Sequence, residues 1–130
     1  MSLSLTGIHH CSVVVSDPTR ARAFYRDVLG LKEIPRPSTF GQDRMGVIWF
    51  VVGDEHLHLI PQNKADSTSP RHFALHVADA KTARVSLRGK DLTIRETTII
   101  PGADRFFISD PDANSIEFIE WKEPYPSSGR

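Results

Sequence analysis

Histidines are the residues of this sequence best suited to chemistry, because imidazole binds transition metals and transfers protons near neutral pH. There are six of them: His9, His10, His56, His58, His72 and His76. All six fall in apolar segments with the composition of β-strands. One histidine on such a strand is usually a packing or surface residue, whereas six in three short segments favour a shared site.

The spacing of these histidines indicates an internal repeat of about sixty residues. His10 precedes Asp17 by seven positions, and His72 precedes Asp79 by seven positions. Each aspartate stands where a helix is expected to begin, since aspartate is a favoured N-terminal cap. His10 and His72 are therefore equivalent residues at the starts of two similar modules.

The ends of the two modules match as well. His58 lies in the apolar segment LHLI, and Glu117 lies at the equivalent place in IEFI. Four equivalent positions, two from each module, thus carry three imidazoles and one carboxylate. If the two modules curl their sheets and pack about a pseudo-twofold axis, we expect these positions to converge in one cup.

The elements that must position these residues follow the same order in both halves. Alternation, capping and turn signals in the first half predict a βαβββ unit over residues 8–16, 17–30, 31–34, 46–52 and 55–60. The second half repeats the pattern over residues 71–78, 79–89, 92–99, 105–109 and 115–121. We therefore expect one α+β domain, 1–130, with modules at about 7–60 and 71–121, a linker 61–70 and a tail 122–130.

The chemistry of the four positions predicts a metal site. Nitrogen and oxygen donors without a thiolate suit a divalent transition metal (Fe, Ni, Zn, Mn or Co) better than Mg or Ca. Side chains alternate between the faces of a strand, so His10 and His9 are expected to point in opposite directions. His9 should then turn into packing or a subunit contact.

Other candidates for the cup are weaker. His76 is expected on the face of His72. Trp49, Arg105 and Phe106 lie on strands near the ligands, but core packing explains the two aromatic residues equally well, and a solvated face explains Arg105. Phe40, in the preceding loop, is a candidate lid residue.

Composition excludes several functions. Sixteen basic and sixteen acidic residues cancel, so the chain lacks the basic bias of nucleic-acid or anionic-membrane partners. Its apolar runs are strand-sized and its N-terminus lacks the pattern of a signal peptide, which predicts a soluble, cytoplasmic protein. Cys11, the single cysteine, excludes an internal disulfide and is expected to be a buried, unreactive thiol.

Four segments carry a family resemblance: HHCSVVVSDPTRARAFYRDVLGL (9–31), GDEHLHLIP (53–61), RHFALHVAD (71–79) and FFISDPDANSIEFIE (106–120). Over residues 7–121 the chain resembles the vicinal oxygen chelate superfamily, which includes glyoxalase I, extradiol dioxygenases, and fosfomycin- and bleomycin-resistance proteins. The resemblance implies paired βαβββ modules forming a cup around a metal, and often a homodimer. It places the family's ligands on His10, His72 and Glu117, with a fourth on His58.

Departures from the family pattern narrow the expected reaction. Glyoxalase I typically has a carboxylate at the position of His58, and many bacterial glyoxalases have an arginine at that of Val14. Both differences count against the hemithioacetal of methylglyoxal and glutathione as substrate. Bleomycin-binding members usually lack metal ligands, so the full ligand set counts against a purely sequestering role.

Three functions follow as alternatives. The first is a metal-dependent isomerase or lyase that binds a small substrate through vicinal oxygens, stabilises an enolate-like charge, and uses Glu117 as general base. The second is an Fe(II) extradiol-type dioxygenase built on His10, His72 and Glu117, with His58 or His76 as an acid or base. The third is a non-catalytic, antibiotic-type binding protein.

Overall fold

The computed structural model describes residues 3–44 and 46–124, so the predicted tail beyond residue 124 lies outside the described residues. The chain divides into two compact units, Met1–Ser67 and Thr68–Arg130, called module 1 and module 2 below. Each contains one four-stranded sheet. The expected α+β fold of two βαβββ modules is confirmed.

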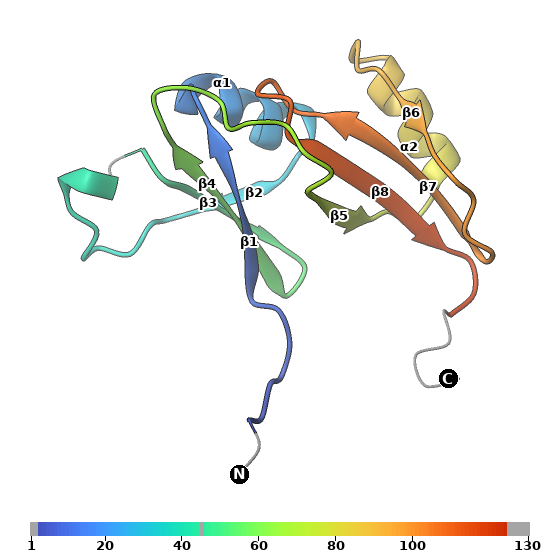
Figure 1. The fold of residues 1–130 in the computed structure, drawn as a ribbon, viewed down its shortest axis with the longest axis horizontal. Coiled ribbons are helices and arrows are strands. Elements are labelled where there is room, and N and C mark those ends of the chain that lie inside the picture. Colours follow the sequence, from blue (N-terminus) through green and yellow to red (C-terminus); the bar gives the residue numbers. More distant parts are fainter. Residues whose placement is uncertain (1–2, 45, 125–130) are drawn as a thin grey trace. The chain divides into compact units, whose positions relative to one another are not determined.

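Module 1 has the strand order β1-β4-β3-β2, in which β1 is parallel to β4 and the other neighbours are antiparallel (Figure 1). Its elements are β1 (His10–Val15), α1 (Pro18–Arg22), the π-helix η1 (Ala23–Val28), β2 (Lys32–Ile34), the 3-10 helix η2 (Gln42–Arg44), β3 (Ile48–Val52) and β4 (Glu55–Pro61).

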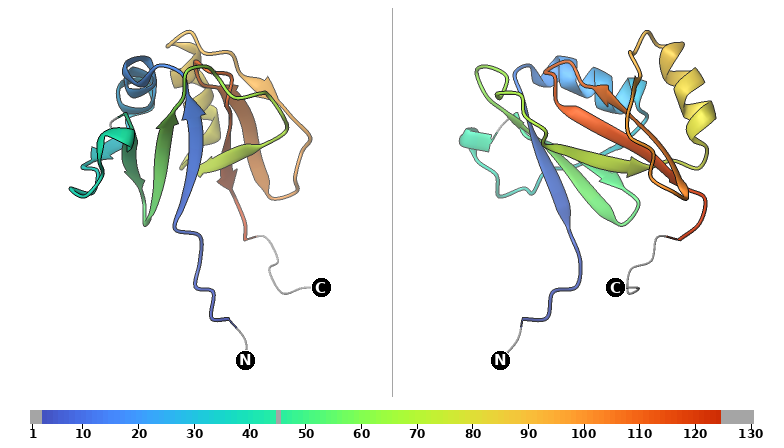
Figure 2. Two further views of the ribbon diagram at one scale, coloured as in Figure 1. Left: turned by 60° about the vertical axis from the view of Figure 1, so that its left-hand side comes forward. Right: turned by 45° about the vertical axis from the view of Figure 1, so that its right-hand side comes forward.

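Module 2 repeats this topology with the order β5-β8-β7-β6, and β5 is parallel to β8. Its elements are β5 (His72–His76), α2 (Ala80–Arg88), β6 (Arg95–Glu96), β7 (Ala103–Ser109) and β8 (Ser115–Trp121) (Figure 2). The position of each strand in one sheet therefore has an equivalent in the other.

Both helices begin at the predicted aspartates. The side chain of Asp17 accepts a hydrogen bond from the backbone N–H of Arg20, and that of Asp79 accepts one from Thr82. These bonds satisfy backbone donors that have no partner inside the helix, and Pro18 costs nothing at the first helical position because it lacks an N–H. The caps fix where β1 and β5 end relative to the helices.

In each module the helix covers one face of the sheet. In module 1 the residues of that face form a buried core with the helix: Val15, Ala21, Phe24, Tyr25, Ile48, Phe50, Leu57 and Leu59. In module 2 the corresponding core is Ala80, Leu87, Phe106, Ile108, Ile116 and Phe118. By strand alternation, the predicted ligands lie on the opposite face of each sheet.

Three local predictions need correction. The first helix continues beyond Arg22 as a π-helix rather than an α-helix. The strand expected over 92–99 is limited to Arg95–Glu96, because only these two residues pair with β7. Strand β1 begins at His10, so His9 lies before the strand and alternation does not govern its direction.

None of the helices among the described residues has the length and apolar character that spanning a membrane requires.

Candidate functional site

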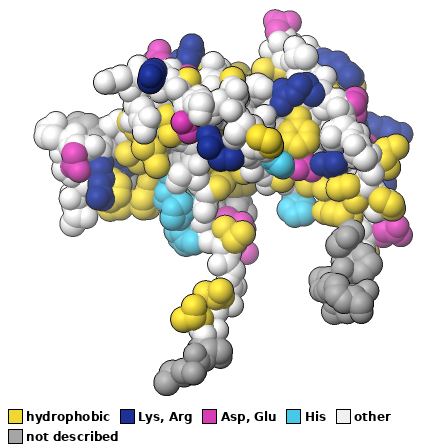
Figure 3. Space-filling view, in the orientation of Figure 1, with side chains coloured by type: hydrophobic (Ala, Val, Ile, Leu, Met, Phe, Trp, Pro, Cys, Tyr) yellow, Lys and Arg dark blue, Asp and Glu magenta, His cyan; other side chains and the backbone are white. Residues whose placement is uncertain are grey.

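In module 1, register brings several ring side chains to the open face of the sheet. His10 pairs with His56, and His58 pairs with Trp49 across β3 and β4. Cross-strand partners share a face, so these four residues project together. Figure 3 shows histidine side chains gathered on this part of the surface.

These rings contact one another closely. The imidazoles of His10 and His58 stack with centroids 4.1 Å apart, and the indole of Trp49 lies parallel to His58 on a centroid distance of 4.0 Å. The His56 Nδ1 atom lies 3.3 Å from His58 Nε2. His58 is therefore fixed by contacts with three rings.

The environment of His58 favours its neutral form. Burial, followed by the nearby imidazoles of His10, His56 and His9, lowers the pKa of His58 from 6.5 to about 4. At neutral pH its ring therefore keeps a nitrogen lone pair, which is the form that binds a metal.

His9 does not point away from His10 as expected. The Nδ1 atoms of the two rings are 2.9 Å apart, and His9 also contacts His56 with ring centroids 4.7 Å apart. One of the two Nδ1 atoms must carry a proton. When that proton is on His10, its Nε2 atom presents a lone pair, so the contact with His9 can set the tautomer of a candidate metal ligand.

In module 2, His72 and Glu117 form the corresponding pair. His72 Nε2 lies 3.1 Å from Glu117 Oε1, while His72 Nδ1 lies 2.9 Å from the carbonyl oxygen of Pro70. That carbonyl can only accept, so Nδ1 carries a proton and Nε2 faces the carboxylate. A proton or a metal cation between Nε2 and Oε1 satisfies both groups, and the bond to a backbone carbonyl is typical of metal-binding histidines.

Arg105 holds the other oxygen of Glu117. Its Nη1 donates to Glu117 Oε2 at 3.3 Å, and its Nε and Nη2 donate to the carbonyl of Thr98 at 3.2 and 2.9 Å. Glu117 is 7 % exposed. A buried carboxylate needs such a partner, so Arg105 both compensates the charge and fixes the orientation of Oε1 toward His72.

The other predicted residues separate into two groups. His76 is exposed on β5 and shares the face of Glu117, because it pairs with Ile119 two positions further along β8. Phe106 lies instead in the core on the helix side, where it stacks on Phe118 and carries the guanidinium of Arg84 over its ring. Phe107 occupies the site face, with its ring centroid 4.8 Å from that of His72. Counting by twos from Arg105 could have identified Phe107.

Cys11 is half-buried on β1, and its burial raises the pKa of the thiol. The thiolate form is therefore disfavoured, which supports the expectation that Cys11 is unreactive.

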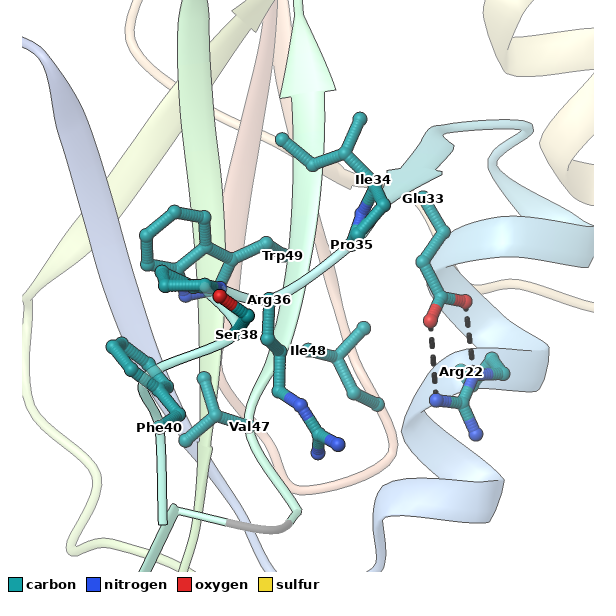
Figure 4. A pocket seen from close by; sticks show the side chains of 11 residues that line it. Arg22, Glu33, Ile34, Pro35, Arg36, Ser38, Phe40, Val47, Ile48 and Trp49 are labelled. Atoms are coloured by element: carbon teal, nitrogen blue, oxygen red, sulfur yellow. Dashed lines mark hydrogen bonds and ion pairs between the residues drawn. The ribbon is translucent and has the colours of Figure 1, made fainter.

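Module 1 also contains a pocket of about 440 Å³ beside β2 and β3. Trp49, Phe40 and Val47 form apolar parts of its wall, and the paired side chains of Arg22 and Glu33 lie at its edge (Figure 4). The Phe40 ring meets the Trp49 indole edge to face, with centroids 5.7 Å apart. Because Trp49 also stacks on His58, a single side chain links this pocket to the histidine cluster.

Within the described ranges, 3–44 and 46–124, no three His, Cys, Asp or Glu side chains are grouped so that they could hold a metal ion. Each module provides a pair of candidate ligands. The chemistry of the donors nevertheless fits a divalent transition metal, because His58 is neutral and His72 Nε2 faces a carboxylate oxygen.

Comparison with known proteins identifies the family. Residues 7–118 match the model of the Glyoxalase/Bleomycin resistance protein/Dioxygenase superfamily, so the chain belongs to this superfamily.

Individual relatives agree with this assignment. The chain is 28 % identical over 116 residues to "Glutathione transferase FosA" of Serratia marcescens, covering 87 % of this chain and 79 % of the relative. A putative glyoxalase family protein from Bacillus anthracis superposes with a TM-score of 0.84 at 29 % identity, covering 94 % of this chain and all of that one. A lactoylglutathione lyase from Agrobacterium tumefaciens shares the fold, with a TM-score of 0.70, 22 % identity, and coverage of 91 % and 96 % of the two chains.

Proposed function

We propose that the protein is a metal-dependent enzyme that binds a small substrate through two neighbouring oxygens and acts as an isomerase or lyase. The proposed ligands are His72 and Glu117 of module 2, with His10 and, as a fourth ligand, His58 of module 1. The observation that carries the proposal is the His72–Glu117 pair, in which His72 Nδ1 donates to a backbone carbonyl and leaves Nε2 facing a carboxylate. Superfamily membership supports the same assignment.

A bound metal of this type acts as a Lewis acid that stabilises negative charge developing on the substrate oxygens. The side chains of the protein do the rest. Glu117 is the proposed general base for a carbon acid. Since Arg105 holds its Oε2, Glu117 would loosen its Oε1 from the metal and take the proton on that oxygen. His58 stays uncharged at neutral pH and therefore keeps the lone pair that the proposed fourth bond to the metal requires.

The contact between His56 and His58 favours a second candidate function. If His58 Nε2 keeps its interaction with His56 Nδ1, the ligands are reduced to His10, His72 and Glu117. Two histidines and one carboxylate are the ligand set of non-haem Fe(II) oxygenases, including extradiol-type dioxygenases. His58 would then act as an acid or base beside the metal.

Elemental analysis of protein purified without chelators tests the proposal. We expect a stoichiometric transition metal in the wild type and a reduced content when His10, His58, His72 or Glu117 is replaced by alanine. His76→Ala and Glu55→Gln are matched controls and should keep the metal. Full metal content in all four ligand variants contradicts the proposal.

The identity of the metal separates the two functions. Nickel, zinc or cobalt with turnover independent of oxygen supports the isomerase or lyase, whereas iron with oxygen uptake on a catechol supports the dioxygenase. Tight binding of a small molecule without turnover would indicate a binding protein instead. We further propose that the protein acts as a homodimer, which light scattering on the eluted protein can measure.

A further inference from the structure

The open face of the module 2 sheet carries two arginines in addition to the candidate ligands. Arg95 pairs with Phe107, and Phe107 pairs with Glu117, so these three side chains form one row across β6, β7 and β8. Arg105 precedes Phe107 by two residues and therefore lies on the same face. The charged residues of this face are thus two arginines and one glutamate.

Arg95 is held in place without a carboxylate partner. Its Nη1 donates to Ser109 Oγ at 2.7 Å, and its Nη2 donates to Ser115 Oγ at 3.1 Å. Among the residues that the structure describes, Arg95 forms no ion pair, and its side chain is exposed. An arginine fixed by neutral hydroxyl groups keeps its full positive charge and loses little conformational entropy when it binds an anion.

The serine contacts direct Arg95 toward the candidate ligands. Ser115 is the register partner of His72, so the Arg95 guanidinium reaches the row that contains this histidine. Arg105 contacts Glu117 directly. The two guanidinium groups therefore approach the His72–Glu117 pair from neighbouring rows.

Both arginines retain hydrogen-bonding capacity. An arginine has five N–H donors. Arg95 makes three hydrogen bonds and Arg105 makes three, which leaves each of them two donors without a partner in the described part of the chain. With Glu117 as the only acid among them, the three side chains carry a net charge of +1 (two positive minus one negative), and a divalent cation would increase it.

We propose that Arg95 and Arg105 form an anion site that takes a carboxylate, phosphate or phosphonate group of the substrate beside the His72–Glu117 pair. The inference rests on the proposed function, since it takes this pair as metal ligands. It adds a substrate class: a small oxygenated compound with an anionic group. The ring of Phe107 lies between the two arginines in the sheet and provides an apolar contact for the rest of that substrate.

Binding of inorganic phosphate, measured by calorimetry, tests this site. The metal-loaded protein and chelator-treated protein are titrated in parallel, because phosphate also binds metal ions directly. We expect Arg95→Gln to weaken phosphate binding by about 10-fold or more in both preparations, as loss of a charged hydrogen-bonding partner predicts. Arg105→Gln should have its larger effect in the metal-loaded protein, where the charge of Glu117 is shared with the metal.

Three controls distinguish anion binding from a structural role. Arg88→Gln removes an exposed arginine from α2 and should leave phosphate binding unchanged. Arg95→Lys keeps the charge but not the planar fork, so it should recover part of the affinity. Thermal unfolding of each variant verifies that it is folded. A parallel titration with acetate shows whether the site prefers a carboxylate or a phosphate.

The outcomes separate this inference from the proposed function. Equal phosphate affinity for wild type, Arg95→Gln and Arg88→Gln in the chelator-treated protein overturns the anion site, whatever the metal content. Absence of a bound metal together with phosphate binding that depends on Arg95 supports the anion site and contradicts the proposed metal-dependent function.

Discussion

The two modules share a topology but differ in the chemistry of their open faces. In module 1 the face around the candidate ligands consists of rings, with His9, His10, His56, His58 and Trp49 in mutual contact. In module 2 the equivalent face carries a carboxylate and two arginines. One backbone plan thus supports a surface of imidazole and indole rings in one copy and a surface with a carboxylate and two guanidinium groups in the other.

The difference has a consequence for how each candidate ligand is held. In module 2, His72 Nε2 and Glu117 Oε1 face each other, and a carbonyl and an arginine fix the two side chains from behind. In module 1, the Nε2 atom of His58 is already engaged by His56. Equivalent positions in a repeat therefore need not contribute equally to a shared function. The candidate ligands of module 2 are better preorganised to bind a metal than those of module 1.

The largest expected effect compares one proposed metal ligand from each module. We expect His72→Ala to lower transition-metal affinity at least about 100-fold, because it removes a ligand whose tautomer is already set. His58→Ala should lower it by about 10-fold or less, because His58 must first give up its contact with His56. Competition with a chromogenic chelator measures both values. A loss for His58→Ala as large as that for His72→Ala would contradict the ranking of the modules.

The second prediction uses the lowered pKa of His58. The unfolded chain binds a proton at this histidine near pH 6.5, whereas the folded protein does so only near pH 4. Between these values the unfolded state binds more protons than the folded state, so the free energy of unfolding rises with pH. The stability that the neutral His58 contributes is therefore lost as the pH falls from 6.5 toward 4. For metal-free protein we expect a loss of about 2 kcal/mol between pH 7 and pH 5.

Urea unfolding of chelator-treated wild type and His58→Leu at the two pH values measures this effect. The variant should lose less stability than the wild type over the same interval. His72→Leu is the control from module 2. An identical pH dependence in wild type and His58→Leu would show that His58 is not the titrating group.

The third prediction concerns His9, whose side chain was expected, from strand alternation in the sequence, to point away from the site. If the His9–His10 contact sets the tautomer of His10, His9→Leu should lower metal affinity about 10-fold, as loss of a hydrogen-bonding partner behind a metal ligand does. His9→Gln retains a carbonyl acceptor and should recover part of the affinity. His76→Leu is the matched control. Equal metal affinity in His9→Leu and wild type would contradict a role of His9 in setting the His10 tautomer and would indicate that His9 only packs against its neighbours.

The smallest expected effect compares the hairpin turns of the two modules. Gly53 between β3 and β4 has a φ of +60°, and Ala113 between β7 and β8 has a φ of +66°. An alanine is strained in this region, whereas glycine is not. We expect Ala113→Gly to stabilise the protein and Gly53→Ala to destabilise it, each by about 1 kcal/mol in urea unfolding. A change of the opposite sign at either position would contradict this account.

Much of the fold could be predicted from the sequence because its signals are local. The caps Asp17 and Asp79, the turn at Gly53 and the alternating strands depend on neighbouring residues, and the repeat follows from their spacing. The elements that the sequence did not predict correctly have physical explanations as well. Strand β6 is short because pairing with β7, rather than propensity, decides where it ends. The sequence also carried no signal for the change to a π-helix after Arg22.

The candidate site likewise has features that the sequence predicts and features that it does not. By itself the sequence determined that His10 and His72, and His58 and Glu117, are equivalent positions on rigid strands, since position along a repeat is a matter of counting. Only the tertiary structure decided the partners of these residues: His9 on His10, Arg105 on Glu117, and the serines that hold Arg95. The physical reason is that such contacts depend on strand register, which joins residues far apart in the chain, and on side-chain rotamer, which decides even the contact between the neighbours His9 and His10. Neither leaves a periodic trace in the sequence.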